Sequence, residues 1–125
     1  LAMREALALL SEAQAARRVF VAGDMLELGD IAEAEHRALG AAIPDAVGVV
    51  VAVGPMAPLV AEGARASGRE VVVLEDAEAA GRWLVENLRD DDVALVKGSG
   101  GIGLDRAVSA AAEARAPKPG AGGRP

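Results

Sequence analysis

The chain has 125 residues, the size of one compact domain, and 52% of them are hydrophobic, which is enough to build one core. Its net charge of −6 disfavours nucleic acids and anionic membrane surfaces as partners, because both carry negative fields that repel it. The absence of cysteine excludes a disulfide framework and a thiolate nucleophile, and a single histidine disfavours a zinc site.

No apolar run approaches the roughly 20 residues that span a bilayer, and the amino terminus lacks the pattern of a signal peptide. We therefore expect a cytoplasmic location without membrane contact. The sequence begins at Leu1 in the middle of a helical pattern and without an initiator methionine. We expect it to be a fragment of a longer protein.

The first predicted element is a helix over residues 2–16, with apolar positions at helical spacing. Four continuous apolar runs predict strands at 17–23, 46–54, 69–76 and 91–98. Segments with helical spacing predict helices at 31–43, 57–67, 77–89 and 104–115. Strands without polar alternation are covered on both faces, as in parallel sheets. The pattern predicts an α/β fold: a three-layer α/β/α sandwich, Rossmann-like, with a mostly parallel sheet.

The composition divides the chain into two segments, a domain and a tail. Residues 1–116 form the predicted α/β domain. The last nine residues, "PKPGAGGRP" at 117–125, hold three prolines and three glycines and cannot bury apolar surface. We expect this segment to be a disordered tail.

In parallel α/β sheets, ligands bind outside the carboxyl ends of the strands. This rule directs attention to the loops at 23–30, 54–56, 75–76 and 98–103. The last of them matches G-x-G-x-x-G, but it follows the final predicted strand, where a dinucleotide fingerprint does not belong. It is not a P-loop either, because Lys97 precedes the glycines.

Lys97 has two interpretations. At the carboxyl end of a buried strand, its ammonium group can neutralise a phosphate or carboxylate. Ser99 and the free N–H groups of the next helix would then add donors for the same anion. Alternatively, Lys97 is an exposed charge at the end of a strand, and Gly98 belongs to a plain strand-to-helix turn.

The loop after the first strand contains a second candidate. Gly23 allows a sharp exit from the strand, and Asp24 could accept hydrogen bonds from ribose hydroxyls or help to position a cation. Its alternative role is to cap the following turn. Glu27 follows three residues later, and the apolar residues around it indicate that the loop packs against another part of the protein.

His36 lies in the predicted helix 31–43, at the border of an expected apolar stripe. The members of that stripe are Ile31, Ala34, Ala38 and Ala42. We expect His36 to be a surface residue or a hydrogen-bonded one. Asp76 is expected to be the N-cap of the helix 77–89.

Four stretches considered together resemble the carboxyl-terminal domain of the Mur ligases. They are "GDMLELG" after the first strand, His36 in the next helix, "AVG" closing the second strand and "LVKGS" closing the last. The opening "LAMREALALL" is similar to the start of that domain. The resemblance covers residues 1 to about 112, and the pairing of the first and last motifs makes it specific.

The resemblance implies a three-domain bacterial cytoplasmic enzyme of peptidoglycan synthesis. Such an enzyme uses ATP to join D-Ala-D-Ala to UDP-MurNAc-tripeptide through an amide bond. Its amino-terminal domain binds the UDP-sugar, and its central ATPase domain holds most of the contacts to ATP and Mg²⁺. The domain resembled here closes over ATP and helps to position the dipeptide. Without the other two domains, we expect it to be inactive.

The resemblance also implies site residues. Asp24, with Gly23, would approach the ATP ribose. Lys97 and Ser99 would lie near the incoming dipeptide and the reacting centre, as the catalytic candidates. Supporting roles would fall to Glu27, His36 and Gly98, and no residue is expected to bind a metal. Gly100 stands where family members often have arginine, so the anion contact of that arginine is expected to be missing unless Arg106 supplies it from the next predicted helix.

Two alternatives from other classes remain at this point. A receiver-like phospho-acceptor module is also α/β and places a lysine at the end of its last strand, and Asp76 would be its acceptor. It needs an acidic pair after the first strand, where this chain has Asp24 and a displaced Glu27. A generic nucleotide-binding or purely structural α/β module is the other alternative.

Overall fold

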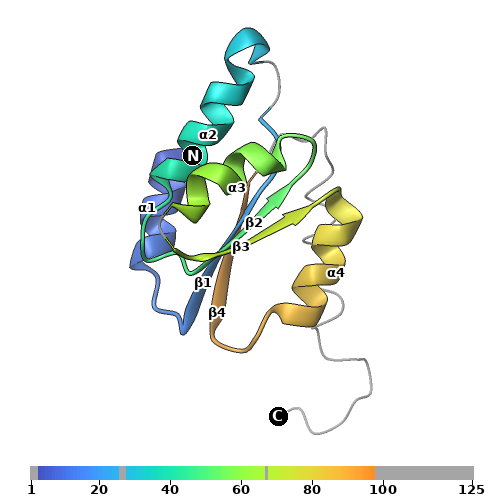
Figure 1. The fold of residues 1–125 in the computed structure, drawn as a ribbon. Helices are drawn as coiled ribbons and strands as arrows, with labels where there is room; N and C mark the ends of the chain where they lie inside the picture. Colours follow the sequence, from blue (N-terminus) through green and yellow to red (C-terminus); the bar gives the residue numbers. More distant parts are fainter. Residues whose placement is uncertain (1–2, 26–27, 67, 98–125) are drawn as a thin grey trace, which may run out of the picture.

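A computed structural model describes residues 3–25, 28–66 and 68–97, and the statements below concern these residues. Helices and strands alternate along the chain (Figure 1). Their bounds are α1 Met3–Glu12, β1 Arg17–Ala22, a short 3-10 helix η1 Gly29–Ile31, α2 Ala32–Ala42, β2 Val49–Val53, α3 Ala57–Arg65, β3 Glu70–Leu74, α4 Ala77–Asn87 and β4 Asp92–Lys97. The predicted order is confirmed over this part of the chain. The predicted helix at 104–115 and tail at 117–125 lie outside it.

The four strands form one parallel sheet in the order β3-β2-β1-β4. From β1 the chain winds outward through β2 to β3, and it then crosses back to place β4 on the other side of β1. The direction of winding therefore reverses between β1 and β4. A crossover that keeps its right hand while its direction reverses must lie on the opposite face of the sheet.

The helices follow that requirement: α1, α2 and α3 cover one face and α4 lies on the other (Figure 1). Along β1, Phe20 and Ala22 pack toward the first group, whereas Val19 and Val21 pack toward α4. Successive strand residues point to opposite faces, so a strand covered on both faces must be apolar at every position. The predicted three-layer sandwich is confirmed.

Helices α2 and α3 approach each other at two glycines. A Cβ atom at Gly40 would collide with the carbonyl oxygen of Val60, and it would lie 2.9 Å from the amide nitrogen of Ala64. A Cβ atom at Gly63 would lie 2.7 Å from the amide nitrogen of Ala41. The two backbones are therefore in direct contact, which a side chain at either position would prevent.

The expected stripe of Ile31, Ala34, Ala38 and Ala42 is wrong. All four residues are exposed, Ile31 by 54%, and α2 instead buries His36, Leu39 and Gly40. Alanine tolerates either side of a helix, so a run rich in alanine does not identify the buried face. The contact with α3 selects the face that contains Gly40, and His36 lies on that face.

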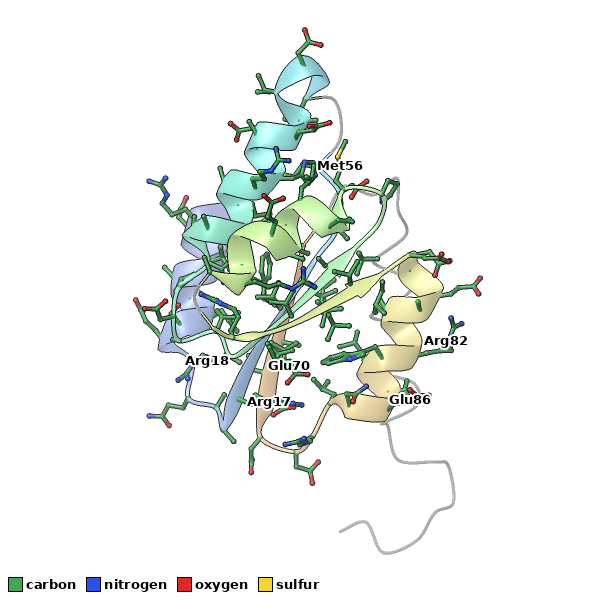
Figure 2. All side chains as sticks on the ribbon, in the orientation of Figure 1. Arg17, Arg18, Met56, Glu70, Arg82 and Glu86 are labelled. Carbon is green, nitrogen blue, oxygen red and sulfur yellow. The ribbon has the colours of Figure 1, made fainter. Side chains whose placement is uncertain are left out.

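Three arginines at the amino edge of the sheet bind carbonyl groups at or near the ends of helices. Arg17 donates to Asn87 of α4, Arg18 donates to Ala13 just after α1, and Arg69 donates to Ile43, the C-cap of α2. Figure 2 shows Arg17 and Arg18 at this end of the molecule, far from Met56 at the other end. Carbonyls at helix ends lack intrahelical partners and carry partial negative charge, which the guanidinium groups satisfy.

Arg17 also forms an ion pair with Asp92, its register partner at the start of β4. Its Nη2 lies 2.7 Å from Oδ2 of Asp92, whose side chain is 2% exposed. The backbone N–H of Arg89 donates to the same oxygen at 2.8 Å. Burial alone would raise the pKa of Asp92, but the hydrogen bonds from Arg17 and Arg89 and the positive charges of both residues together outweigh it and hold that pKa below its ordinary value.

Replacing Asp92 with Asn should lower the free energy of unfolding at pH 7 by about 2 kcal/mol, because it leaves a partly buried Arg17 without its counter-ion. A carboxyl group with a depressed folded-state pKa stabilises the fold above its unfolded pKa, near 4, and loses this contribution as the pH falls through the folded pKa. Urea titrations should therefore show the gap between wild type and variant shrinking from pH 7 to pH 3.

Glu62→Gln is the matched control, since it removes the carboxylate from an exposed pair with Arg37. Its free energy of unfolding should stay close to that of the wild type at both pH values. A gap between wild type and the Asp92 variant that is the same at pH 7 and pH 3 would contradict the assignment.

Candidate functional site

The point where the winding reverses places the ends of β1 and β4 side by side. Ala22 pairs in register with Lys97, and the backbone N–H of Gly23 donates to the carbonyl oxygen of Lys97 at 2.8 Å. In open α/β sheets, the crevice outside such a reversal is where ligands bind. The structure therefore brings Gly23 and Lys97, from two predicted site segments, together at the expected edge.

Lys97 is half-buried at the end of β4. Leu95 packs on the α1 side of the sheet and Val96 packs on the α4 side. Because alternate strand residues share a face, Lys97 leaves the sheet on the side of Leu95, where α2 and α3 also lie. Its side chain consequently starts on the same face of the sheet as Ala22, the residue from which β1 continues into the loop of Asp24.

Asp24 lies directly after β1 and is 7% exposed. Its Oδ1 atom accepts a hydrogen bond of 3.0 Å from the backbone N–H of Met56, the N-cap residue of α3. The capping alternative expected Asp24 to serve the turn that follows it in sequence. Residues 26 and 27 of that turn lie outside the described residues. Within the described ones, Asp24 binds the amino terminus of a helix that begins after the neighbouring strand, where a carboxylate also meets the positive end of the helix dipole.

Gly54, which follows β2, makes room for this carboxylate. Its φ is +108°, and a Cβ atom there would lie 2.7 Å from Oδ1 of Asp24. Both the conformation and the close approach require glycine. Neither Gly54 nor Met56 was predicted to contact Asp24. The one signal for Gly54 in the sequence is a glycine that closes a predicted strand, at the edge of the sheet where ligands bind.

His36, on α2, is hydrogen-bonded to the same loop. Its Nε2 atom accepts a hydrogen bond of 3.0 Å from the backbone N–H of Met25, and its Nδ1 atom lies 2.6 Å from the carbonyl oxygen of Ala32. The side chain is fully buried. The expectation of a hydrogen-bonded histidine is therefore confirmed, and that of a surface histidine is wrong.

Three candidates from the sequence, Glu27, Gly98 and Ser99, lie outside the described residues. Asp76 accepts the backbone N–H of Ala79 at 2.9 Å, so its predicted role as the N-cap of α4 is confirmed. Within residues 3–25, 28–66 and 68–97, no cluster of three or more His, Cys, Asp or Glu side chains could hold a metal ion. No helix in these ranges is long and apolar enough to cross a membrane.

This edge thus combines a carboxylate on one loop with an ammonium group on the neighbouring strand. Asp24 accepts hydrogen bonds and Lys97 donates them, so a ligand with hydroxyl groups and negative charge could be bound between them. The carboxylate is held by α3, and the peptide after it is held by α2. Its position is consequently determined before any ligand arrives.

Comparison with known proteins identifies relatives that match most of the length of this chain. The family model described as "Mur ligase, glutamate ligase domain" matches residues 1–100. The UDP-N-acetylmuramoyl-tripeptide–D-alanyl-D-alanine ligase of Bacillus subtilis (strain 168) is 35% identical over 95 residues, which are 74% of this chain and 21% of that ligase.

Solved structures of similar fold include a crystal structure of MurF from Acinetobacter baumannii. It has a TM-score of 0.76 and 28% identity, over 89% of this chain and 25% of that one. The structure of MurF ligase from Thermotoga maritima in complex with ADP has a TM-score of 0.65 and 21% identity, over 90% of this chain and 26% of that one. The second likeness shows the fold alone.

The cap on α3 can be tested in the 125-residue chain. Asp24→Ala should lower the free energy of unfolding by about 1 to 2 kcal/mol, because the amide of Met56 loses its acceptor. Asp24→Asn keeps an oxygen acceptor in the same place and should retain most of that stability. Urea denaturation measures both, and equal losses in the two variants would refute the capping role.

Proposed function

The chain belongs to the Mur ligase family, and we propose that it is the carboxyl-terminal domain of a ligase that joins D-Ala-D-Ala to UDP-MurNAc-tripeptide. It spans about a fifth of the length of the curated relative it matches, so the complete activity requires further domains. The observation that carries the proposal is the pairing of Ala22 with Lys97. It brings "GDM" and "VK", from the two motifs of the family resemblance, to the reversal point of one sheet.

The domains expected from the family would supply what these residues lack. The 125 residues contain no G-K-[ST] P-loop, so a central ATPase domain would bind the phosphates of ATP and Mg²⁺. An amino-terminal domain would bind the UDP-sugar. In this arrangement the present domain closes over ATP from the carboxyl edge of its sheet and is inactive alone. Because ATP and a UDP-sugar are the proposed substrates, we expect the reaction to take place in the cytoplasm.

Asp24 fits a role toward the ATP ribose. The bond from Met56 uses one of about four lone-pair sites on the carboxylate, which leaves acceptor capacity for ligand hydroxyls. The amide of Gly23 donates to the carbonyl oxygen of Lys97, which attaches the start of the Asp24 loop to the reversal point. The buried, capped geometry holds the carboxylate in one orientation, so it loses little freedom on binding a sugar.

Lys97 fits a role toward the reacting centre. ATP, when bound, supplies the phosphoryl group that activates the tripeptide carboxylate. The ammonium group of Lys97 would offset negative charge that develops at the activated carbonyl or on the phosphate. Ser99 would add a hydroxyl donor from the loop that follows. Glu27 and Gly98 keep their expected supporting roles, while His36 contacts the Asp24 loop.

The receiver-like alternative is not favoured. Its acceptor would be Asp76, but this side chain caps α4 through the amide of Ala79. The match to a ligase family argues against the second alternative, a generic α/β module.

The coding sequence upstream of Leu1 offers a simple check of the proposal. A P-loop encoded about one ATPase domain before Leu1 would support the ligase.

Lys97→Ala in the full-length ligase should lower kcat/KM by about 100-fold or more while changing the free energy of unfolding little, because a lysine at the end of a strand contributes little packing. Arg82→Ala is the control, since it removes a positive charge from an exposed i,i+4 pair on α4. Steady-state kinetics and urea denaturation of the same preparations separate the two effects. Parallel losses of turnover and stability would mean that Lys97 is only structural.

Asp24→Asn in the same ligase should weaken ATP binding about tenfold, because an amide nitrogen replaces one carboxylate oxygen facing the ribose. Asp76→Asn makes the same chemical change at another loop of the sheet edge and should leave the ATP Kd unaltered. Isothermal titration calorimetry with ATP measures both. An Asp24→Asn variant that binds ATP like the wild type would remove the ribose role.

A further inference from the structure

The one histidine of the chain is completely enclosed and bonded on both sides of its ring. His36 lies on α2, Met25 lies on the loop after β1, and Ala32 lies one turn earlier on α2. Leucine would fill a space of this kind in an ordinary core. A polar ring at this position therefore serves the two backbone groups that it touches.

Those two groups decide which ring nitrogen carries the proton. The N–H of Met25 can only donate, so the Nε2 atom facing it must present a lone pair. The carbonyl of Ala32 can only accept, so the Nδ1 atom facing it must carry hydrogen. A ring with hydrogen on Nε2 would set two N–H groups against each other. One arrangement satisfies both partners, and it is the neutral ring protonated on Nδ1.

We propose that His36, as this neutral Nδ1–H tautomer, is a positioning residue that holds the peptide between Asp24 and Met25 and thereby orients the Asp24 carboxylate. The inference rests on the proposed function only in its last step, where the oriented carboxylate meets a ligand. Asp24 is attached at two points: its side chain to Met56 and its following peptide to His36. The two attachments come from α3 and α2, whose backbones are in contact at Gly40 and Gly63.

Two substitutions separate positioning from packing. His36→Leu fills the space but offers no acceptor to the N–H of Met25. His36→Gln places a side-chain oxygen at about the distance of Nε2 from the backbone and can accept the same hydrogen bond. The carbonyl of Ala32 keeps its ordinary helical partner, the backbone amide of residue 36, in both variants.

The first measurement is the tautomer itself. Long-range ¹H–¹⁵N correlation spectra of the uniformly labelled 125-residue chain at neutral pH should show a protonated Nδ1 and an unprotonated Nε2 for His36. No other histidine is present to overlap with it. A ring protonated on Nε2 alone, or on both nitrogens, would overturn the proposal.

The second measurement is amide hydrogen exchange at Met25. Exchange should be about tenfold faster in His36→Leu than in the wild type and should return close to the wild-type rate in His36→Gln. Ala79, whose amide is bound to Asp76 on the far side of the sheet, is the internal control and should be unaffected. If Met25 exchanges alike in wild type and His36→Leu, or if Gln gives no rescue, His36 does not position this peptide.

The final measurement connects positioning with binding. In the full-length ligase, His36→Leu should raise the ATP Kd several-fold, and His36→Gln should restore it. The failures are distinguishable. If Met25 exchange responds as expected while Asp24→Asn leaves ATP binding intact, the ribose role proposed for Asp24 fails and the positioning of the loop holds. If Asp24→Asn weakens ATP binding while neither His36 variant changes Met25 exchange, the positioning role is wrong.

Discussion

The parallel pairing of β1 with β4 is the constraint on which the other features depend. Six register pairs run from Arg17 with Asp92 to Ala22 with Lys97. One end of this ladder holds a buried ion pair, and the other end holds the candidate site. A slip of one residue would turn every side chain of β4 to the opposite face of the sheet. The Arg17–Asp92 pair thus helps to set the register that brings Lys97 beside Gly23.

Close packing of α2 against α3 positions the loop after β1 at the carboxyl edge of the sheet. The contact at Gly40 and Gly63 brings α2 and α3 together without intervening side chains. Each helix then holds one part of the loop after β1, α3 through the amide of Met56 and α2 through His36. Gly54 keeps open the space that the Asp24 carboxylate occupies. Close contacts at Gly40, Gly54 and Gly63 therefore contribute to the position of the Asp24 carboxylate.

The two edges of the sheet have different tasks. At the amino edge, Arg17, Arg18 and Arg69 are committed to carbonyl groups of the loops and helix ends. Burial lowers the pKa of Arg69, and Asp45 partly opposes that effect. At the carboxyl edge, Asp24 and Lys97 stand on adjacent strand ends, where a parallel sheet binds its ligands. Substitutions at the amino edge can therefore change stability without altering the side chains of the candidate site, whereas Asp24 serves both the fold and the site.

The sequence by itself determined the elements, the fold class and the family, because these depend on local patterns. Apolar runs without alternation mark the four strands, of which β1 and β2 are buried on both faces. Asp76 caps the helix beside it, and "GDMLELG" with "LVKGS" points to the Mur ligases. Only the tertiary structure decided the buried face of α2, because alanine is compatible with either side and the contact at Gly40 makes the choice. The same holds for Asp24, whose partner Met56 is 32 residues away. Such a contact depends on which strands are neighbours in the sheet, and no local pattern contains that order.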